Sequence, residues 1–195
     1  MERIREMLIV HDYDPFYWFS VSPDGHYLAL FFDSHADGKS FDLLMMNLRS
    51  GTLEPIYFAN TNGDVAFDRQ NGFYFVQIDG SGRGAALFRH QLPEEGEHDE
   101  QVTNLVYEEP NSDYGLNLHN SLSGDFIVLD ICSTYSPRTN EIWLKHTSDE
   151  RQDFSLVQGL RFGVRYQIKH SGDFLYKMSN EEDLINYKVT RITLP

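Results

Sequence analysis

The residue types that could carry out acyl transfer are all present in this chain, but their spacing matches no catalytic motif. Serine hydrolases of the α/β type place the nucleophile in a Gly-x-Ser-x-Gly turn between a strand and a helix. The two glycine pairs with that spacing begin at Gly80 and Gly159, and they enclose Gly82 and Arg161 instead of serine. Ser, His and Asp are plentiful, but a triad is defined by its geometry. The sequence therefore predicts no catalytic residue on this chain.

The sequence also contains no motif for metal binding or for thiol chemistry. The histidines lie at positions 11, 26, 35, 90, 98, 119, 146 and 170. None of them forms a His-x-x-x-His pair, and a single cysteine cannot form a Cys-x-x-Cys motif. That cysteine, Cys132, follows the apolar run 126–131, which favours a small buried hydrophobic residue over a nucleophile. We predict no metal site and no bound cofactor.

Three polar stretches offer weaker alternatives. Gly80-Ser-Gly-Arg-Gly resembles a phosphate-binding loop, but no helix and no Lys-Ser/Thr pair follow it, so a flexible loop explains it better. Asp12 and Asp14 could act as an acid and a base, yet their place between two expected strands favours turn residues. The acidic stretch 94–101 is a solvated connection or, as the alternative, a cation site.

The elements that would position such groups repeat along the chain. Gly25, Gly72, Gly124 and Gly172 recur at spacings of 47, 52 and 48 residues, each just ahead of an apolar run opened by an aromatic residue. Every repeat predicts a strand, a tight turn with glycine at positive φ, an apolar strand, a third strand and an outer strand. Repeats near fifty residues in an all-strand sequence are typical of β-propeller blades.

The strands themselves follow from the hydrophobic pattern. In the first repeat we expect strands at residues 18–22, 27–32, 41–48 and 53–58. The second strands of the later repeats, at 73–76, 126–129 and 174–176, are continuous in apolar residues. Continuous patterning predicts burial on both faces of the sheet, as in a blade stacked between two others. No helix of any length is indicated.

We therefore predict an all-β fold, a β-propeller segment of about four blades with four antiparallel strands per blade. The blade repeats cover residues 16–58, 63–108, 115–160 and 163–195, and residues 5–10 form an additional outer strand. The last segment, 188–194, reads as a third strand with no fourth after it. Either the two ends pair and close a four-bladed ring, or the chain is an arc of a larger ring.

Composition narrows the possible partners and the compartment. The 195 residues are 41% hydrophobic, which is enough for a substantial core, and carry a formal net charge of −14. Nucleic acid and anionic membrane surfaces are disfavoured as partners, because both require clustered Lys and Arg. The apolar stretch near the amino terminus is too short for a signal peptide, and no run reaches transmembrane length. With one cysteine and no possible intrachain disulfide, we expect a cytoplasmic protein.

Four stretches follow one another along the chain: the opening 5–30, Val-Tyr-Glu-Glu-Pro at 106–110, Thr-Asn-Glu-Ile-Trp at 139–143, and 163–176. In this order they resemble the amino-terminal propeller of the prolyl oligopeptidase family, with oligopeptidase B as the nearest branch. The resemblance implies a seven-bladed propeller joined to an α/β-hydrolase domain with a Ser-Asp-His triad, which cleaves after basic residues or after proline. Ser133, Thr134 and Tyr135 stand where prolyl-specific members have an arginine, which favours the oligopeptidase B branch.

Two functions of different classes remain open from the sequence. The first is a non-catalytic propeller portion of a serine peptidase, which gates the access of short peptides to a hydrolase domain that these residues do not contain. Asp33, Asp37 and Asp113 could then bias the cavity toward basic peptides, although surface solvation is the simpler explanation. The second is a stand-alone propeller that binds a protein partner without peptidase activity. An independent hydrolase fits poorly, because the sequence predicts no nucleophile.

Overall fold

The computed structural model describes residues 16–33, 37–92, 102–136, 140–151, 153–181 and 186–193. Within these residues the chain is all-β, with fourteen strands and no α-helix, as the sequence predicted. The strands belong to two compact units, Met1–Gly63 and Asp64–Pro195. The expected outer strand at 5–10, the carboxylates Asp12 and Asp14 and the acidic stretch 94–101 lie outside the described residues.

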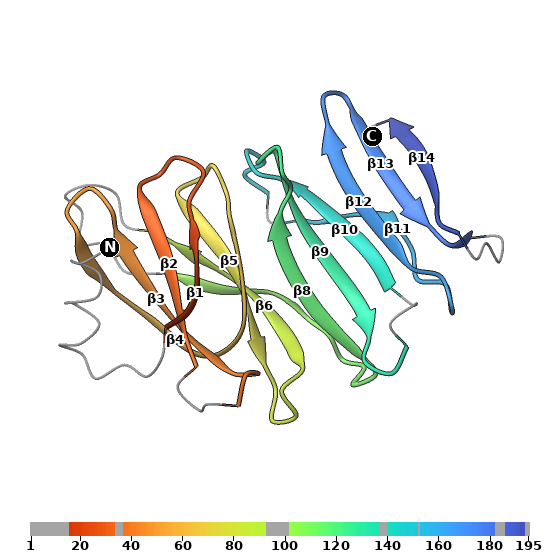
Figure 1. The fold of residues 1–195 in the computed structure, drawn as a ribbon. Coiled ribbons are helices and arrows are strands. Elements are labelled where there is room, and N and C mark those ends of the chain that lie inside the picture. Colours follow the sequence, from red (N-terminus) through yellow and green to blue (C-terminus); the bar gives the residue numbers. More distant parts are fainter. Residues whose placement is uncertain are drawn as a thin grey trace. The chain divides into compact units, whose positions relative to one another are not determined.

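The first unit is an antiparallel meander built from consecutive hairpins (Figure 1). Its strands are β1 (Phe16–Val21), β2 (Tyr27–Phe32), β3 (Phe41–Asn47) and the first part of β4 (Thr52–Phe67). Every side chain of β2 is buried, as its continuous apolar sequence predicts. The turn before β2 is closed by Ser22, whose hydroxyl oxygen accepts the backbone N–H of Tyr27 at 2.9 Å, and by Gly25 at φ 72°. These bonds set the register of the first hairpin.

Strand β4 differs from the prediction, because one strand of 16 residues replaces the outer strand 53–58 and a separate strand near Val65. Two residues in positive φ, Asn60 at 58° and Gly63 at 87°, let the backbone change direction without ending the strand. Gly63 is also tightly surrounded: its carbonyl oxygen accepts Trp18 Nε1–H at 3.0 Å, and a Cβ there would lie 3.1 Å from a ring atom of Phe41.

The second unit contains the end of β4 and ten further strands of the described chain (Figure 1). Next to β4 in the sheet order come β5 (Gly72–Ile78), β6 (Gly84–Gln91) and β7 (Thr103–Glu108). A second sheet has the order β11 (Ser155–Gln158), β10 (Asn140–His146), β9 (Phe126–Ser133) and β8 (Tyr114–Asn120). A third has the order β12 (Tyr166–Ser171), β13 (Phe174–Ser179) and β14 (Lys188–Thr193). All pairings recorded between these strands are antiparallel.

The sheets of the second unit bury their apolar faces against one another in series. One core cluster joins Tyr74 and Val76 of β5 to Leu116 of β8 and Ile127 of β9. Another joins Val128, on the opposite face of β9, to residues of β12 and β13. The middle sheet is therefore covered on both faces, which explains the continuous apolar run in β9 and agrees with the predicted stacking of blades.

Strand β13 departs from that pattern. Leu175 is buried in the core with the middle sheet, but Tyr176, on the opposite face, remains 38% exposed. The expectation that residues 174–176 are buried on both faces is therefore wrong for the described chain. Successive side chains of a strand point to opposite faces, and the packing recorded for this sheet covers the Leu175 face.

The predicted four blades are not seen as four separate sheets. The described strands form three sheets, of seven, four and three strands, and none of them closes into a ring. The count differs because β4 continues past Gly63 instead of ending, so the first seven strands share one sheet order.

The glycine of the second repeat has a different role from the one predicted. Gly25, Gly124 and Gly172 hold positive φ at their turns, but in the second repeat Asn71 takes that conformation, at φ 54°. At Gly72 a Cβ would lie 2.6 Å from Arg89 Nη2 and 3.0 Å from the carbonyl oxygen of His90. Gly72 is therefore required by close approach of the neighbouring strand β6 and not by its backbone angles.

A buried histidine in β6 should make the stability of the fold decrease at acidic pH. His90 is 1% exposed, its Nδ1 lies 2.8 Å from Thr103 Oγ1, and its ring packs 5.3 Å from that of Phe73. Burial, and then the positive charge of Arg89, lower the pKa of His90 to about 4. Because the unfolded pKa is higher, at 6.5, the stabilisation is complete above pH 6.5 and is lost as the pH falls toward 4.

We expect the free energy of unfolding to fall by up to about 3 kcal/mol between pH 7.5 and pH 4, measured by urea unfolding at each pH. His90→Gln, which keeps a polar group near Thr103, should flatten this pH dependence, whereas the exposed control His146→Gln should leave it unchanged. An equal pH slope in the wild type and in His90→Gln would contradict the assignment.

Candidate functional site

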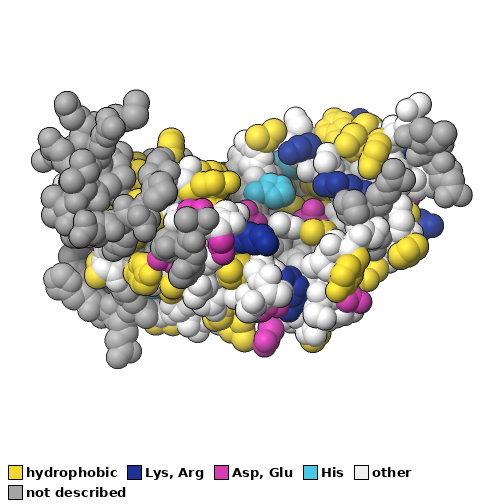
Figure 2. Space-filling view, turned by 60° about the horizontal axis from the view of Figure 1, so that its bottom comes forward, with side chains coloured by type: hydrophobic (Ala, Val, Ile, Leu, Met, Phe, Trp, Pro, Cys, Tyr) yellow, Lys and Arg dark blue, Asp and Glu magenta, His cyan; other side chains and the backbone are white. Residues whose placement is uncertain are grey.

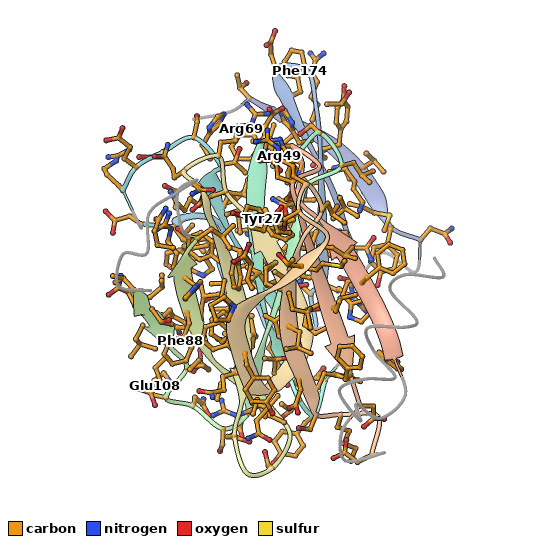
Figure 3. The ribbon with its side chains drawn as sticks, turned by 90° about the vertical axis from the view of Figure 1, so that its left-hand side faces the viewer. Tyr27, Arg49, Arg69, Phe88, Glu108 and Phe174 are labelled. Atoms are coloured by element: carbon orange, nitrogen blue, oxygen red, sulfur yellow. The ribbon has the colours of Figure 1, made fainter. Side chains whose placement is uncertain are left out.

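The loops of the second unit gather at two opposite ends of its strands. The turn end consists of residues 68–71, 121–125, 147–151 and 171–173, and the connection end of residues 79–83, 109–113, 134–136 and 159–165. Figure 3 shows Arg69 at the turn end, and Phe88 and Glu108 on β6 and β7 toward the connection end. Each sequence-predicted group can be placed relative to these two ends.

At the turn end the fold brings a serine, a histidine and an aspartate together. Ser123 Oγ lies 2.7 Å from Nδ1 of His170, and Asp125 Oδ2 lies 3.6 Å from that same nitrogen. In a Ser-His-Asp triad, one ring nitrogen of the histidine accepts the serine hydroxyl and the other donates to the aspartate. Nε2 of His170 is instead buried without a hydrogen-bond partner among the described residues. Serine and aspartate thus lie against the same ring nitrogen, which is not the arrangement of a Ser-His-Asp triad.

The same cluster connects neighbouring sheets. Arg69 Nη2 donates to Asp125 Oδ1 at 2.9 Å, and the Arg69 backbone N–H donates to the carbonyl of Thr147 at 2.8 Å. Gln70 Nε2 donates to the carbonyl of Ser148 at 2.9 Å. These contacts hold the hairpin between β4 and β5 against two hairpins of the next sheet.

The stretch Gly80-Ser-Gly-Arg-Gly, at the connection end, forms a closed turn around Asp79. One oxygen of that carboxylate accepts the backbone N–H of Ser81 at 2.9 Å and the hydroxyl of Ser81 at 2.6 Å. The other accepts Arg83 Nε–H at 2.8 Å. These hydrogen bonds, from Ser81 first, lower the pKa of Asp79. The donors that a phosphate would need are bound to Asp79, which argues against the phosphate-loop alternative.

Arg83 continues from this turn to fix the connection between β7 and β8. Its Nη1 donates to the carbonyl oxygens of Asn111 at 3.0 Å and Tyr114 at 2.7 Å, and approaches that of Glu109 at 3.3 Å. The side chain is only 12% exposed. A single guanidinium therefore satisfies carbonyl groups of the connection and of the start of β8.

Cys132 lies half-buried in β9, close to polar neighbours that the sequence did not predict. Asn117 Nδ2 donates to its sulfur at 2.9 Å. Burial, and then the charge of Asp130, raise the pKa of the Cys132 thiol, while Arg165 opposes this only weakly. A raised pKa leaves the thiol protonated at neutral pH, which agrees with the interpretation of Cys132 as a packed residue and not a nucleophile.

Two asparagine side chains bind the backbone of a strand in the neighbouring sheet, in the way that a backbone amide of an adjacent strand would. Asn120 Nδ2 donates to the carbonyl of Phe67 at 2.8 Å, and its Oδ1 accepts the Phe67 N–H at 2.8 Å. Asn140 does the same to Tyr166, at 3.0 and 2.7 Å, and its Nδ2 also donates to Asp130 Oδ1 at 2.7 Å. Each amide thus replaces one rung of a β-ladder between sheets. The sequence analysis missed both, because an isolated asparagine carries no signal of a distant partner.

The three aspartates considered for peptide selectivity all take part in hydrogen bonds within the protein. In the first unit, Asp33 accepts the backbone N–H groups of Asp37 and Gly38 at 3.1 and 3.0 Å, and Asp37 accepts that of Ser40 at 2.9 Å. In the second unit, the carbonyl of Asp113 accepts the N–H of Thr134 at 2.8 Å. Asp33 and Asp37 therefore stabilise a loop, which supports the simpler explanation for both.

An edge strand of the second sheet and one of the third carry exposed polar side chains. β8 and β12 are the first strands of the second and third sheets, and along each of them buried and exposed residues alternate. His119 on β8 and Lys169 on β12 belong to the exposed set. Packed protein atoms around the ring, and then the charge of Lys169, lower the pKa of His119. The alternation Leu-Asn-Leu-His and Tyr-Gln-Ile-Lys was the available sequence signal.

The described part of the chain offers neither a metal site nor a membrane-spanning helix. No group of three or more His, Cys, Asp or Glu side chains is placed there to hold a metal ion. The same residues contain no helix with the length and hydropathy needed to cross a membrane. The exposed polar side chains along the edge strands β8 and β12 form the candidate functional surface.

Comparison with known proteins identifies the architecture. The sequence model of the family described as prolyl oligopeptidase, N-terminal beta-propeller domain, matches residues 12–195. Protease 2 from Moraxella lacunata is 31% identical over 121 residues, which are 62% of this chain and 16% of that protein. Oligopeptidase B from Leishmania major superimposes with a TM-score of 0.80 at 17% identity, over 97% of this chain and 26% of that one. Oligopeptidase B from Trypanosoma brucei, in a closed form with covalently bound antipain, gives 0.76 at 18% identity, with the same coverages.

The chain therefore spans only 16% to 26% of the length of these relatives. The structural similarities establish the fold, and the sequence match over residues 12–195 establishes the family. The chain belongs to the prolyl oligopeptidase family, in which it corresponds to the N-terminal β-propeller domain.

Proposed function

We propose that this chain is the non-catalytic propeller portion of an oligopeptidase B-like or prolyl oligopeptidase-like serine peptidase. The observation that carries the proposal is the family match over residues 12–195, together with a superposition that covers 97% of this chain but 26% of an oligopeptidase B. The positions of Ser123, His170 and Asp125, which do not form a triad, are consistent with a bond-breaking group supplied by a separate hydrolase domain. A cytoplasmic location, suggested by the single cysteine, is part of the same proposal.

The four predicted blades are retained as part of this proposal. In it, β1 to β4 form the first blade, and β4 continues past Gly63 to become the first strand of a second blade with β5, β6 and β7. The sheets of β8 to β11 and of β12 to β14 supply the third and fourth. The serial packing of the sheets of the second unit supports this division.

The proposed role is to gate access to an α/β-hydrolase domain that is the partner of this propeller. In a propeller the first strand of each blade lines the central channel, so β8 and β12 would face the peptides that pass. A passage lined by closely packed sheets admits flexible short peptides and excludes folded proteins. The asparagine links of Asn120 and Asn140, which hold sheets together at these strands, support a channel of fixed width.

The complete gene product provides the test of the peptidase assignment. We expect a Gly-x-Ser-x-Gly turn beyond residue 195 and hydrolysis of fluorogenic peptides after Arg, Lys or Pro. The 195-residue chain assayed alone should show no turnover above background. A complete reading frame that lacks such a turn would contradict the peptidase assignment. The remaining hypothesis would then be a stand-alone propeller that binds a protein partner.

Gating has a separate test in a series of substrates of increasing size. One cleavable sequence is placed in a ten-residue peptide and in a surface loop of a folded protein. We expect kcat/KM for the peptide to exceed that for the folded protein by at least roughly a hundredfold, since passage and not chemistry separates the two. Equal values would show that the propeller does not restrict access.

A further inference from the structure

The connection end of the second unit exposes two large aromatic side chains. Phe162, between β11 and β12, is 89% exposed, and Tyr135, directly after β9, is 80% exposed. Among the described residues of this unit, no other aromatic side chain is more than half exposed. Figure 2 turns the lower side of Figure 1, where this end lies, toward the viewer and shows hydrophobic side chains at the surface. Aromatic residues are enriched where proteins bind other proteins.

Hydrogen bonds hold the loop of Phe162 on both sides of the aromatic residue. On one side, Arg161 Nη1 donates to Glu181 Oε1 at 3.1 Å. On the other, the carbonyl of Gly163 accepts Asn180 Nδ2–H at 2.9 Å. A side chain on a backbone that is already fixed requires little further ordering when it binds, and this lowers the cost of binding.

The loop of Tyr135 is held in a similar way. Ser133 Oγ accepts the backbone N–H groups of Tyr135 at 3.3 Å and of Ser136 at 3.1 Å. The backbone N–H and the hydroxyl of Thr134 both donate to the carbonyl of Asp113, at 2.8 and 3.1 Å. The connection end therefore presents two aromatic side chains on backbones that the fold has already fixed.

The turn end offers a useful contrast. Among its described residues, the large apolar side chain that is exposed is Leu122, which is 87% exposed in the turn between β8 and β9. A single aliphatic side chain at the surface is common in soluble proteins and does not mark a binding site. Leu122 therefore serves as a control of nearly equal exposure at the opposite end.

The strand topology determines at which end a further domain would be joined. The sheet of β8 to β11 contains four strands that pair antiparallel in chain order. With an even number of such strands, the chain enters and leaves the sheet at the same end. The segments on either side, 109–113 and 159–165, both lie at the connection end. In a propeller of four-stranded blades, a domain joined through the main chain is therefore joined at this end.

We propose that Phe162 and Tyr135 anchor the hydrolase domain of the same polypeptide against the connection end. This inference deepens the proposed function and rests on it, because the hydrolase domain is the partner named there. Each ring would enter an apolar surface of that domain and lose its contact with water, as do the residues that dominate binding at protein interfaces. The channel of the propeller would then open toward the hydrolase domain at the connection end.

Hydroxyl-radical footprinting of the complete gene product tests whether the two rings are covered. Oxidation rates are corrected for the intrinsic reactivity of each residue type and compared with that of Leu122. We expect Phe162 and Tyr135 to be oxidised at least about fivefold more slowly than Leu122, because the hydrolase domain excludes solvent from them. Equal corrected rates would show that the connection end is uncovered and would overturn the anchor.

Matched variants of the complete gene product test whether the rings hold the domain. In Phe162→Ser/Tyr135→Ser, the preference in kcat/KM for the ten-residue peptide over the folded protein should fall at least about tenfold, because the two domains separate more easily. Phe162→Trp should retain the preference, and so should Leu122→Ser at the turn end. Circular dichroism confirms that each variant is folded. An unchanged preference in the double variant would overturn the anchor.

The failure of the anchor can be distinguished from the failure of the proposed function. If the wild-type gene product hydrolyses peptides while Phe162 and Leu122 are oxidised at equal corrected rates, only the anchor is wrong. If the reading frame contains no hydrolase turn and the wild type hydrolyses no peptide, the proposed function is wrong and the anchor has no partner.

Discussion

Asn140→Leu should lower the free energy of unfolding by about 4 kcal/mol, because a buried amide that joins two sheets would be lost. Asn140 is 2% exposed, and its Oδ1 and Nδ2 hold the N–H and the carbonyl of Tyr166. Each buried backbone group left without a partner costs about 1–3 kcal/mol. Asp130, whose pKa burial raises, would lose the donor from Asn140 as well.

Urea unfolding and thermal melting measure this effect. A loss of about 4 kcal/mol corresponds to a decrease of roughly 8–16 °C in Tm for a chain of this length. The control is Asn104→Leu on the exposed side of β7, which should change stability by less than about 0.5 kcal/mol.

A second variant separates lost hydrogen bonds from a general effect of packing. Asn140→Asp keeps the size and the acceptor but removes the donor and places a second carboxylate beside Asp130. It should be less stable at pH 7 than at pH 5, relative to wild type, because protonation relieves the repulsion. If Asn140→Leu were as stable as Asn104→Leu, Asn140 would not be an energetic link between the sheets.

Arg83→Met should destabilise the second unit by about 3–4 kcal/mol. The methionine keeps much of the apolar stem but removes the hydrogen bonds of the guanidinium to Asp79, Asn111 and Tyr114. Hydrogen bonds from a charged donor contribute about 1.5–3 kcal/mol each, and the Arg83 side chain that makes these is only 12% exposed. Arg83→Lys should recover less than half of the loss, since one ammonium cannot reach all of these acceptors.

Hydrogen exchange locates the effect of Arg83→Met. Protection should fall first in the connection 109–113 and at the start of β8, and later in β13, which Arg83 does not contact. Arg151→Met serves as the control, because Arg151 forms an ion pair with Asp149 at 2.8 Å but is 78% exposed. Such a fully exposed pair is screened by water and contributes little to stability. Equal stabilities of the two variants would contradict the role of Arg83.

Much of the architecture could be read from the sequence because it depends on local patterns. The apolar runs of β2, β5 and β9 predicted strands buried on both faces, and the glycines at Gly25, Gly124 and Gly172 marked turns. Tight turns and two-face burial are short-range properties of the chain, so a single sequence reveals them. The order of the motifs then indicated the family.

The contacts between sheets could not be read in the same way. Asn120 and Asn140 act on Phe67 and Tyr166, which lie 53 and 26 residues away, and only the fold brings these groups together. The same holds for Ser123 and His170, 47 residues apart, whose meeting resembles a catalytic pair until the ring nitrogens are distinguished. Sequence spacing carries no information about which nitrogen of a histidine faces which neighbour.

The sequence by itself determined the all-β character, the positions of most strands, the repeat and the family, because each rests on patterns shorter than one repeat. Only the tertiary structure decided that β4 continues through Asn60 and Gly63, that Gly72 is closely approached by Arg89 and the His90 carbonyl, and that Asn140 binds the backbone of Tyr166. Those results depend on the packing of strands that are distant in the chain, and packing is settled by the complete three-dimensional arrangement of side chains within each unit.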